Sequence, residues 1–276
     1  MILFTKNRIF YDKFYIIIIG ILYFVSLFIL YKGGKKVNMI HNQENFIIFK
    51  GFSTKGIFLI SELPVVPSAN LKQEIIEIDG RHGFLTNSQD AYEPVEIDIE
   101  LKIYNKEDIS KIRNVFRGSG NLILSNFPDR YYKATVTSKL DFERVVRQCH
   151  TGLVTFTLQP HAYELKDNTI NLTSTSTSYT LTNNTNATAQ PEITIYGTGT
   201  ATLIIGDETI RIKDINDHII LDYELQESYR ISNGSPSNAN RDVSCDYGEI
   251  QTGDTLIEWS GDGITGIKIN PRWRHL

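Results

Sequence analysis

Apolar and polar residues alternate along several short stretches of the chain, a pattern typical of strands that bury one face. The clearest stretch is Val95–Ile103, where every second residue is aliphatic and charged residues fill the positions between. Two shorter apolar runs, 46–49 and 57–60, are separated by Gly51 and Gly56. We expect these two runs to form strands in a hairpin-like arrangement, because glycine accepts the positive φ angles that tight turns require.

One stretch of the chain has helical spacing instead. Asn105 is a suitable N-cap, and acidic residues follow it in the first turn, where the helix dipole favours them. Apolar residues then recur on one helical face: Ile109, Ile112, Val115 and Phe116. Gly118 and Gly120 are expected to end the helix, whose apolar stripe indicates packing against a core.

The second half of the chain is predicted to be a separate β unit. Residues 167–190 are rich in Ser, Thr and Asn, which indicates a linker followed by an entering strand. Strands are expected beyond it at 191–196, 201–205, 208–213, 219–223, 228–231, 255–259 and 264–269, the first two split by a turn at Gly197 and Gly199. Short strands at this spacing without helices favour a sandwich or jelly roll. The predicted fold class is therefore mainly β, with domains at 39–166 and 191–276.

Residues 1–38 form a hydrophobic segment that fits neither domain. The run Phe14–Tyr31 carries no charge and approaches the length needed to span a bilayer, with lysines or arginines on both sides. One interpretation is a membrane anchor. The other, which we favour, is upstream sequence translated from an over-extended reading frame, because Lys32-Gly33-Gly34 can be encoded by a purine-rich ribosome-binding site just before Val37 and Met39.

Composition and charge exclude several classes of protein. The chain has 276 residues, of which 41% are hydrophobic and 22% charged, so a packed core is expected. A formal net charge of -4 gives no electrostatic reason to expect a nucleic-acid partner. Cys149 and Cys245 are too few and too far apart for a zinc site or a disulfide framework, and we expect both to be reduced thiols.

No catalytic, metal-binding or cofactor-binding motif is present in the sequence. The six histidines lack the spacing of a metal site, and Cys149 and His150 should point to opposite faces of a strand. Asp262-Gly263 beside Trp259 could form a sugar- or calcium-binding loop, although a hairpin turn next to a core tryptophan is the favoured interpretation. We therefore expect no catalytic residues, no metal, no cofactor and no enzyme activity.

Two motifs carry a resemblance to a known family. Phe127-Pro128-Asp129-Arg130-Tyr131-Tyr132, followed by Ala134, and Gln159-Pro160-His161-Ala162-Tyr163 resemble the distal tail proteins (Dit) of long-tailed phages and prophages of Gram-positive bacteria. In the second half, 191–199, 221–222 and 265–274 look like the second domain of that family. Together these matches cover nearly all of residues 39–276 and none of 1–38.

The resemblance implies a structural role in a virion. It implies an N-terminal, β-sandwich-like domain with one helix that builds a ring, usually hexameric, and a C-terminal sandwich similar to galectins or carbohydrate modules. It also implies a baseplate hub at the tail tip, assembled in the bacterial cytoplasm, with the tail tube, the tape-measure protein and a tail lysin, fibre or receptor-binding protein as partners. A ring subunit needs a conformable arm, and 63–67 and 81–93 are the candidate arms.

Two other functions remain open at this point. The first is a carbohydrate-binding module for host cell-wall saccharide, which would use Trp259, Trp273 or Tyr247 as stacking faces. The second is a membrane-anchored surface protein, which requires that residues 14–31 are genuinely translated.

Overall fold

The computed structural model describes residues 45–138, 142–146, 149–173 and 175–276. The predictions for residues 1–38, including the run Phe14–Tyr31, lie outside these described residues. Among the residues that are described, no helix combines the length and the apolar character needed to cross a membrane.

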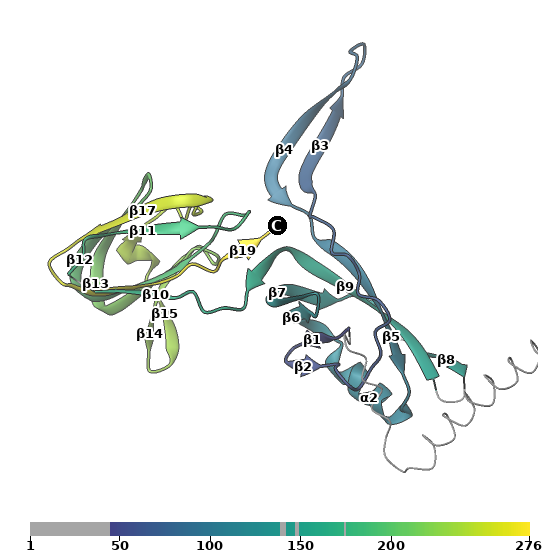
Figure 1. Ribbon diagram of the computed structural model, residues 1–276. Coiled ribbons are helices and arrows are strands. Elements are labelled where there is room, and N and C mark those ends of the chain that lie inside the picture. Colours follow the sequence, from purple (N-terminus) through teal and green to yellow (C-terminus); the bar gives the residue numbers. More distant parts are fainter. Residues whose placement is uncertain (1–44, 139–141, 147–148, 174) are drawn as a thin grey trace, which may run out of the picture. The chain divides into compact units, whose positions relative to one another are not determined.

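The first antiparallel sheet is organised around one long strand, β9 (Cys149–Glu164) (Figure 1). On one side β9 pairs with β7 and β8, and on the other with β5 and β19. The sheet continues from β7 through β6 and β1 to β2. Its other strands are β1 (Ile47–Phe49), β2 (Phe52–Ser53), β5 (Val95–Ile103), β6 (Gly118–Leu124), β7 (Phe127–Val136), β8 (Phe142–Val146) and β19 (Arg274–His275).

The core of this sheet follows the predicted periodicities. The five aliphatic residues of β5 are buried and the residues between them face outward, as the alternation predicts. Helix α2 (Lys106–Val115) directs Ile112 into the same core, and Phe116 follows it there. The rings of Phe116 and Phe156 contact edge to face, with their centroids 6.0 Å apart. The prediction of one helix with a core-facing stripe is confirmed, whereas Gly118 and Gly120 lie in β6.

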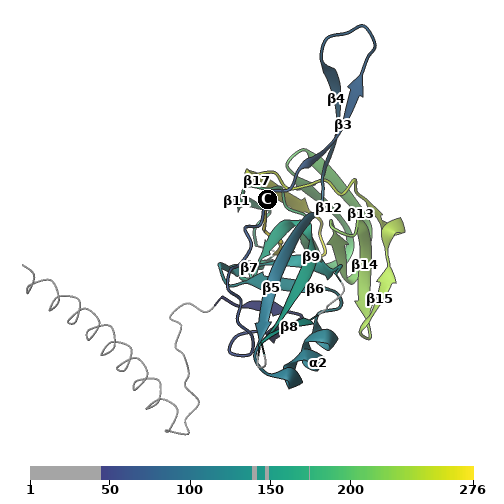
Figure 2. The same cartoon turned by 90° about the vertical axis from the view of Figure 1, so that its right-hand side faces the viewer.

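Strands β3 (Leu71–Glu77) and β4 (Phe84–Tyr92) form a two-stranded sheet of their own. They are joined by the turn 79–83, in which Gly80 and Gly83 adopt φ angles of 80° and 82°. Both views draw this hairpin as a separate ribbon (Figures 1 and 2). Nearly all of its side chains are exposed, including several large apolar ones.

A second antiparallel sheet contains the remaining strands. Its order is β10-β18-β12-β13-β14-β15, with β17 pairing both β11 and β12, and β16 pairing β13. The bounds are β10 (Ile170–Thr173), β11 (Ser178–Asn183), β12 (Glu192–Ile205), β13 (Glu208–Asp222), β14 (Glu227–Ser232), β15 (Ser235–Asn238), β16 (Val243–Ser244), β17 (Gly253–Ser260) and β18 (Ile264–Asn270), with a 3-10 turn η1 (Asn240–Asp242). Its buried aliphatic residues form a core cluster separate from that of the first sheet.

The structure corrects several predicted boundaries. Residues 57–60 form only a single bridge, Leu59 to Lys102, and the partner of β1 is β2 instead. The stretch 167–190 contains two strands, β10 and β11, where one entering strand was expected. The strands 208–213 and 219–223 are one strand, β13.

Strand β12 is likewise continuous where a turn was predicted. Gly199 has a φ of 88° and lies at a bulge, and Gly197 lets the backbone of Gly263 approach so closely that a Cβ would meet its carbonyl oxygen at 2.1 Å. The glycines therefore serve a bulge and a close backbone approach within a strand.

Candidate functional site

The two most specific sequence motifs lie side by side in the first sheet. Tyr131 of β7 pairs with Tyr163 of β9, and Tyr132 pairs with Ala162. The rings of Tyr131 and Tyr163 stack with their centroids 5.5 Å apart and their planes 20° from parallel. The motifs therefore form one local structure, although some 30 residues separate them in the chain.

Strand β9 is interrupted within the second motif by a bulge at Gln159-Pro160-His161. On the β7 side, pairing ends at Leu158 and resumes at Ala162. On the opposite side, β5 stops at Leu158 and β19 starts at Ala162, so the pairings of the described strands skip these three residues on both edges. Pro160 is tolerated here because it has no ladder hydrogen bond to donate. Bulges of this kind redirect side chains, often beside a functional site.

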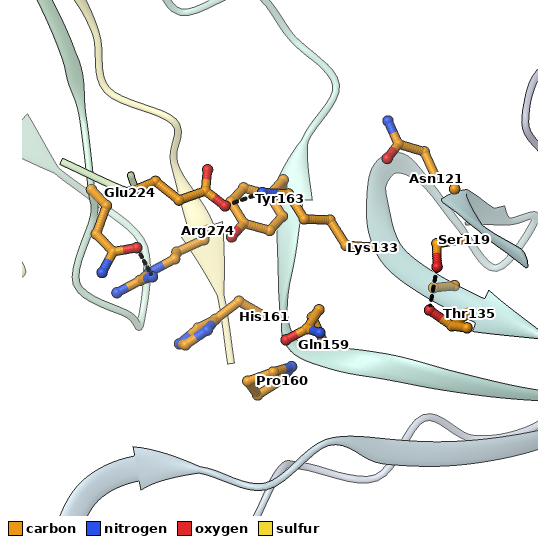
Figure 3. Close-up of a pocket in the computed structure, with 13 residues that line it drawn as sticks. Ser119, Asn121, Lys133, Thr135, Gln159, Pro160, His161, Tyr163, Glu224 and Arg274 are labelled. Carbon is orange, nitrogen blue, oxygen red and sulfur yellow. Dashed lines mark hydrogen bonds and ion pairs between the residues drawn. The ribbon is translucent and has the colours of Figure 1, made fainter. Parts of the chain in front are cut away.

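The side chains of this bulge line a cleft of about 630 Å³ (Figure 3). Three neighbouring strands of the first sheet contribute polar residues: Ser119 and Asn121 of β6, Lys133 and Thr135 of β7, and Gln159, His161 and Tyr163 of β9. Gln190, Glu224 and Arg274 complete the lining. Most of the lining residues are thus polar, with Gly120, Ala134 and Pro160 between them.

The charged groups around the cleft are paired with one another. Lys133 donates to Glu224, and its Nζ lies 4.5 Å from the centroid of the Tyr163 ring. Burial lowers the pKa of Lys133, but the hydrogen bond to Glu224 and the nearby Tyr163 outweigh this and hold the pKa above its ordinary value. Lys133 is therefore a cation that is already partnered inside the protein.

Arg274 is the second cation at the cleft, and its side chain is 7% exposed. Its guanidinium donates to the Thr188 carbonyl, to the Thr188 hydroxyl at 2.9 Å, to Gln190 Oε1 at 3.0 Å and to Glu249 Oε1 at 2.8 Å. Its backbone pairs with Tyr163 as part of β19. Four acceptors leave this guanidinium little capacity for a ligand.

His161 is kept neutral by its surroundings. Burial and then the positive charge of Arg274 lower the pKa of His161 to about 4. Its ring packs edge to face against Tyr92, with centroids 5.7 Å apart. The neutral imidazole can donate from one ring nitrogen and accept at the other.

The lowered pKa of His161 predicts a loss of stability at mildly acid pH. In the unfolded state His161 is protonated below about pH 6.5, whereas in the folded state it is protonated only below about pH 4. The free energy of unfolding therefore falls as the pH drops from about 6.5 to about 4. We expect the free energy of unfolding to decrease between pH 7 and 4.5, with about 2 kcal/mol of the decrease due to His161. Denaturant unfolding at both pH values measures this.

The matched variants are His161→Gln and, as a control, His82→Gln on the exposed turn of the β3–β4 hairpin. His161→Gln should flatten the pH dependence and His82→Gln should not. Asp222 and Glu249 have pKa values below their ordinary ones and also make stability fall on acidification, but they are present in the wild type and in both variants, so their contribution is common to all three proteins. Equal pH dependence in the wild type and His161→Gln would contradict the assignment.

A second polar cluster lies beside the cleft, at the end of β13. Asp222 is 2% exposed and receives Arg272 in a bidentate pair, with Nη1–Oδ1 at 2.7 Å and Nη2–Oδ2 at 2.9 Å. Burial raises the pKa of Asp222, but the bonds from Arg272 and from the backbone of Glu224 and Leu225 bring it below its ordinary value. This cluster stabilises the fold, since all its members are mutually satisfied.

The aromatic residues proposed for sugar stacking do not form a platform. Trp259 is 6% exposed within the second core, beside the β17–β18 turn that contains Asp262 and Gly263, as the favoured interpretation predicted. Trp273 and Tyr247 pack against the same core, and the Tyr247 hydroxyl is bonded to Ser228. No stacking surface therefore arises from these three residues.

The described residues contain no cluster of His, Cys, Asp and Glu side chains able to hold a metal ion. Cys149 and Cys245 are free and partly buried. Burial raises the pKa of the Cys245 thiol to about 12. Cys245 is therefore a poor nucleophile at neutral pH, since only the thiolate reacts.

Comparison with known proteins identifies a solved structure with a similar fold. No protein-family model and no curated protein sequence matches the chain. Among solved structures, the chain is similar to the crystal structure of SPP1 Dit (gp 19.1), described as a paradigm of the hub adsorption apparatus in phages that infect Gram-positive bacteria. The TM-score is 0.68 at 12% sequence identity, over 85% of this chain and all of that one. The fold expected from the two motifs is thereby confirmed.

Proposed function

We propose that the chain is a structural hub protein of a phage tail tip. It forms a ring, most simply a hexamer, that joins the tail tube to the host-adsorption apparatus, and it acts without catalysis. The observation that carries the proposal is the likeness in fold to the SPP1 hub protein, which covers the entire length of that protein and 85% of this chain. Ring formation and the joining of the tube are inferences from that likeness and from surfaces of this chain.

The β3–β4 hairpin is the first such surface. Ile75, Ile78, Phe84 and Leu85 are exposed by 61%, 44%, 60% and 40%. An isolated two-stranded sheet is marginally stable in water, and large apolar side chains grouped on the surface indicate a partner. A neighbouring subunit would bury them. Of the candidate arms, 81–93 is part of this hairpin, whereas 63–67 forms no strand.

The outer edge of β5 is the second surface. One edge of β5 pairs with β9 over its whole length, whereas on the other edge the described residues make only the Leu59–Lys102 bridge. Free strand edges are templates for pairing with another chain. In a ring, this edge would pair with a strand of the adjacent subunit.

The two separate core clusters support a division of roles between the two halves of the chain. We propose that residues 39–166 build the ring and that 191–276 form a peripheral sandwich, joined through 167–190. The tail tube and tape-measure proteins would contact the ring, and a tail lysin, fibre or receptor-binding protein would attach below it. The protein would be assembled in the host cytoplasm and located at the virion tail tip.

Native mass spectrometry and negative-stain electron microscopy of the purified full chain test the proposal. We expect a closed ring of one defined stoichiometry, with six copies as the simplest case. A chain that stays monomeric at high concentration, with and without the tail-tube protein, would overturn the proposed function.

A further inference from the structure

The cleft at the β9 bulge is lined by several polar side chains that can each donate and accept a hydrogen bond and have no hydrogen-bond partner within the described residues. Within the described residues, no hydrogen bond occupies the amides of Asn121 and Gln159, the ring nitrogens of His161 or the hydroxyl of Tyr163. The two amides carry no charge, and His161 is neutral because of its surroundings. Each amide offers both a donor and an acceptor, as do the imidazole and the phenol.

The charged side chains of the cleft are, by contrast, engaged inside the protein. Lys133 is bound to Glu224, and Arg274 to four acceptors. An anionic ligand would have to break one of these pairs and leave a buried or half-buried partner unsatisfied, which is costly. The site therefore discriminates against charged ligands.

The architecture of the cleft floor also excludes an added peptide strand. Strand β7 pairs on both edges, and β9 does so on either side of its three-residue bulge. The outer edge of β6 pairs with β1 over residues 122–124, and beyond it Lys50 lies against this edge, with its backbone N–H donating to the Asn121 carbonyl and its Nζ to the Arg117 carbonyl. A peptide has no continuous edge to extend. The volume of about 630 Å³ lies in the range of small-ligand sites, which is roughly 300–1,000 Å³.

We propose that this cleft binds a neutral, polyhydroxylated ligand, a short saccharide. The amides of Asn121 and Gln159 would each bond a hydroxyl on a different part of the ligand, the groups of His161 and Tyr163 would bond others, and the ring of Pro160 would contact C–H groups of the sugar. Lys133 and Glu224 keep their ion pair and shape the cleft. The proposed site is independent of ring assembly and uses none of the tryptophans.

Isothermal titration calorimetry of the full chain with maltotetraose and with chitotetraose tests the proposal. The cleft variant is Asn121→Ala/Gln159→Ala, and the matched control is Gln73→Ala/Asn87→Ala, which removes the same two amides from the β3–β4 hairpin. We expect at least one saccharide to bind the wild type and the control, and binding to the cleft variant to be about tenfold weaker. Affinity should be equal at pH 5.5 and 7.5.

Three results would overturn the proposal: no binding of either saccharide at millimolar concentration, equal binding by the cleft variant, or tighter binding of the anionic glycan hyaluronan than of both neutral ones. Thermal unfolding of each variant shows whether the fold is retained. Native mass spectrometry of the same samples reports ring assembly separately, so a failure of the saccharide site is distinguishable from a failure of the hub function.

Discussion

Replacing Arg272 by Met should lower the free energy of unfolding by about 3 kcal/mol, because it leaves the Asp222 carboxylate buried without its cation. Arg272 also donates to Glu192 Oε2 at 2.6 Å. The single substitution therefore removes the ion-pair partner of two carboxylates, which lie on the neighbouring strands β12 and β13. Methionine retains much of the apolar volume of the arginine stem, which limits the loss of packing. Urea unfolding of wild type and variant at neutral pH measures the difference.

A double-mutant cycle separates the ion pair from packing. Asp222→Asn removes the buried charge but keeps an oxygen for the backbone N–H groups of Glu224 and Leu225. Arg272→Met/Asp222→Asn should therefore lose less than the sum of the two single losses. Arg211→Met, on an exposed position of β13, is the matched control and should change stability by no more than about 0.5 kcal/mol. Strict additivity would show that the pair is not coupled.

Much of this fold is predictable because burial imposes periodicity on the sequence. Strand β5 lies over a core on one face only, so its alternation reproduces its bounds. Helix α2 and the strands β17 and β18 were identified for the same reason, each having one buried face. Local pattern is sufficient wherever a single face of an element is buried.

The errors arise where long-range pairing decides the structure. Gly197 and Gly199 have the composition of a turn, but β13 pairs with β12 at both glycines and β18 pairs with it as far as Gly197, so this stretch is a strand with bulges. The polar stretch 167–190 is similarly drawn into strands because β17 and β18 supply partner edges. Sequence pattern alone does not identify these partners, whether they lie on the next strand, as β13 does for β12, or about 70 or more residues away, as β17 and β18 do for β11 and β10.

The candidate site is predictable only in part. The residues at the β9 bulge belong to a motif singled out in the sequence, with Pro160 as a signal that regular pairing is interrupted there. Glu224 and Arg274 carried no such signal, because they reach the cleft only through the pairing of β19 with β9 and through the Lys133 ion pair. The neutrality of His161 likewise depends on burial beside a distant arginine.

Placing charge on the β3–β4 hairpin should convert the proposed ring into monomers. Ile76 and Leu85 are directly opposite on one face, and Ile75 and Phe84 are diagonal neighbours on the other. Ile76→Lys/Leu85→Lys or Ile75→Lys/Phe84→Lys would require an interface to bury two unpaired ammonium groups, costing several kcal/mol. The mass distribution in native mass spectrometry should shift from the ring to the single chain.

The matched control is Gln73→Lys/Ser88→Lys, which adds the same charge at a directly opposed polar pair of the hairpin. Because the hairpin contributes little to either core, thermal unfolding should show that the chain stays folded in all three double variants. Rings that persist in both apolar-to-lysine variants would show that the exposed apolar side chains are not buried between subunits. Equal disruption by the control would instead assign the effect to net charge, since all three variants add the same two lysines and differ only in whether apolar contact is lost.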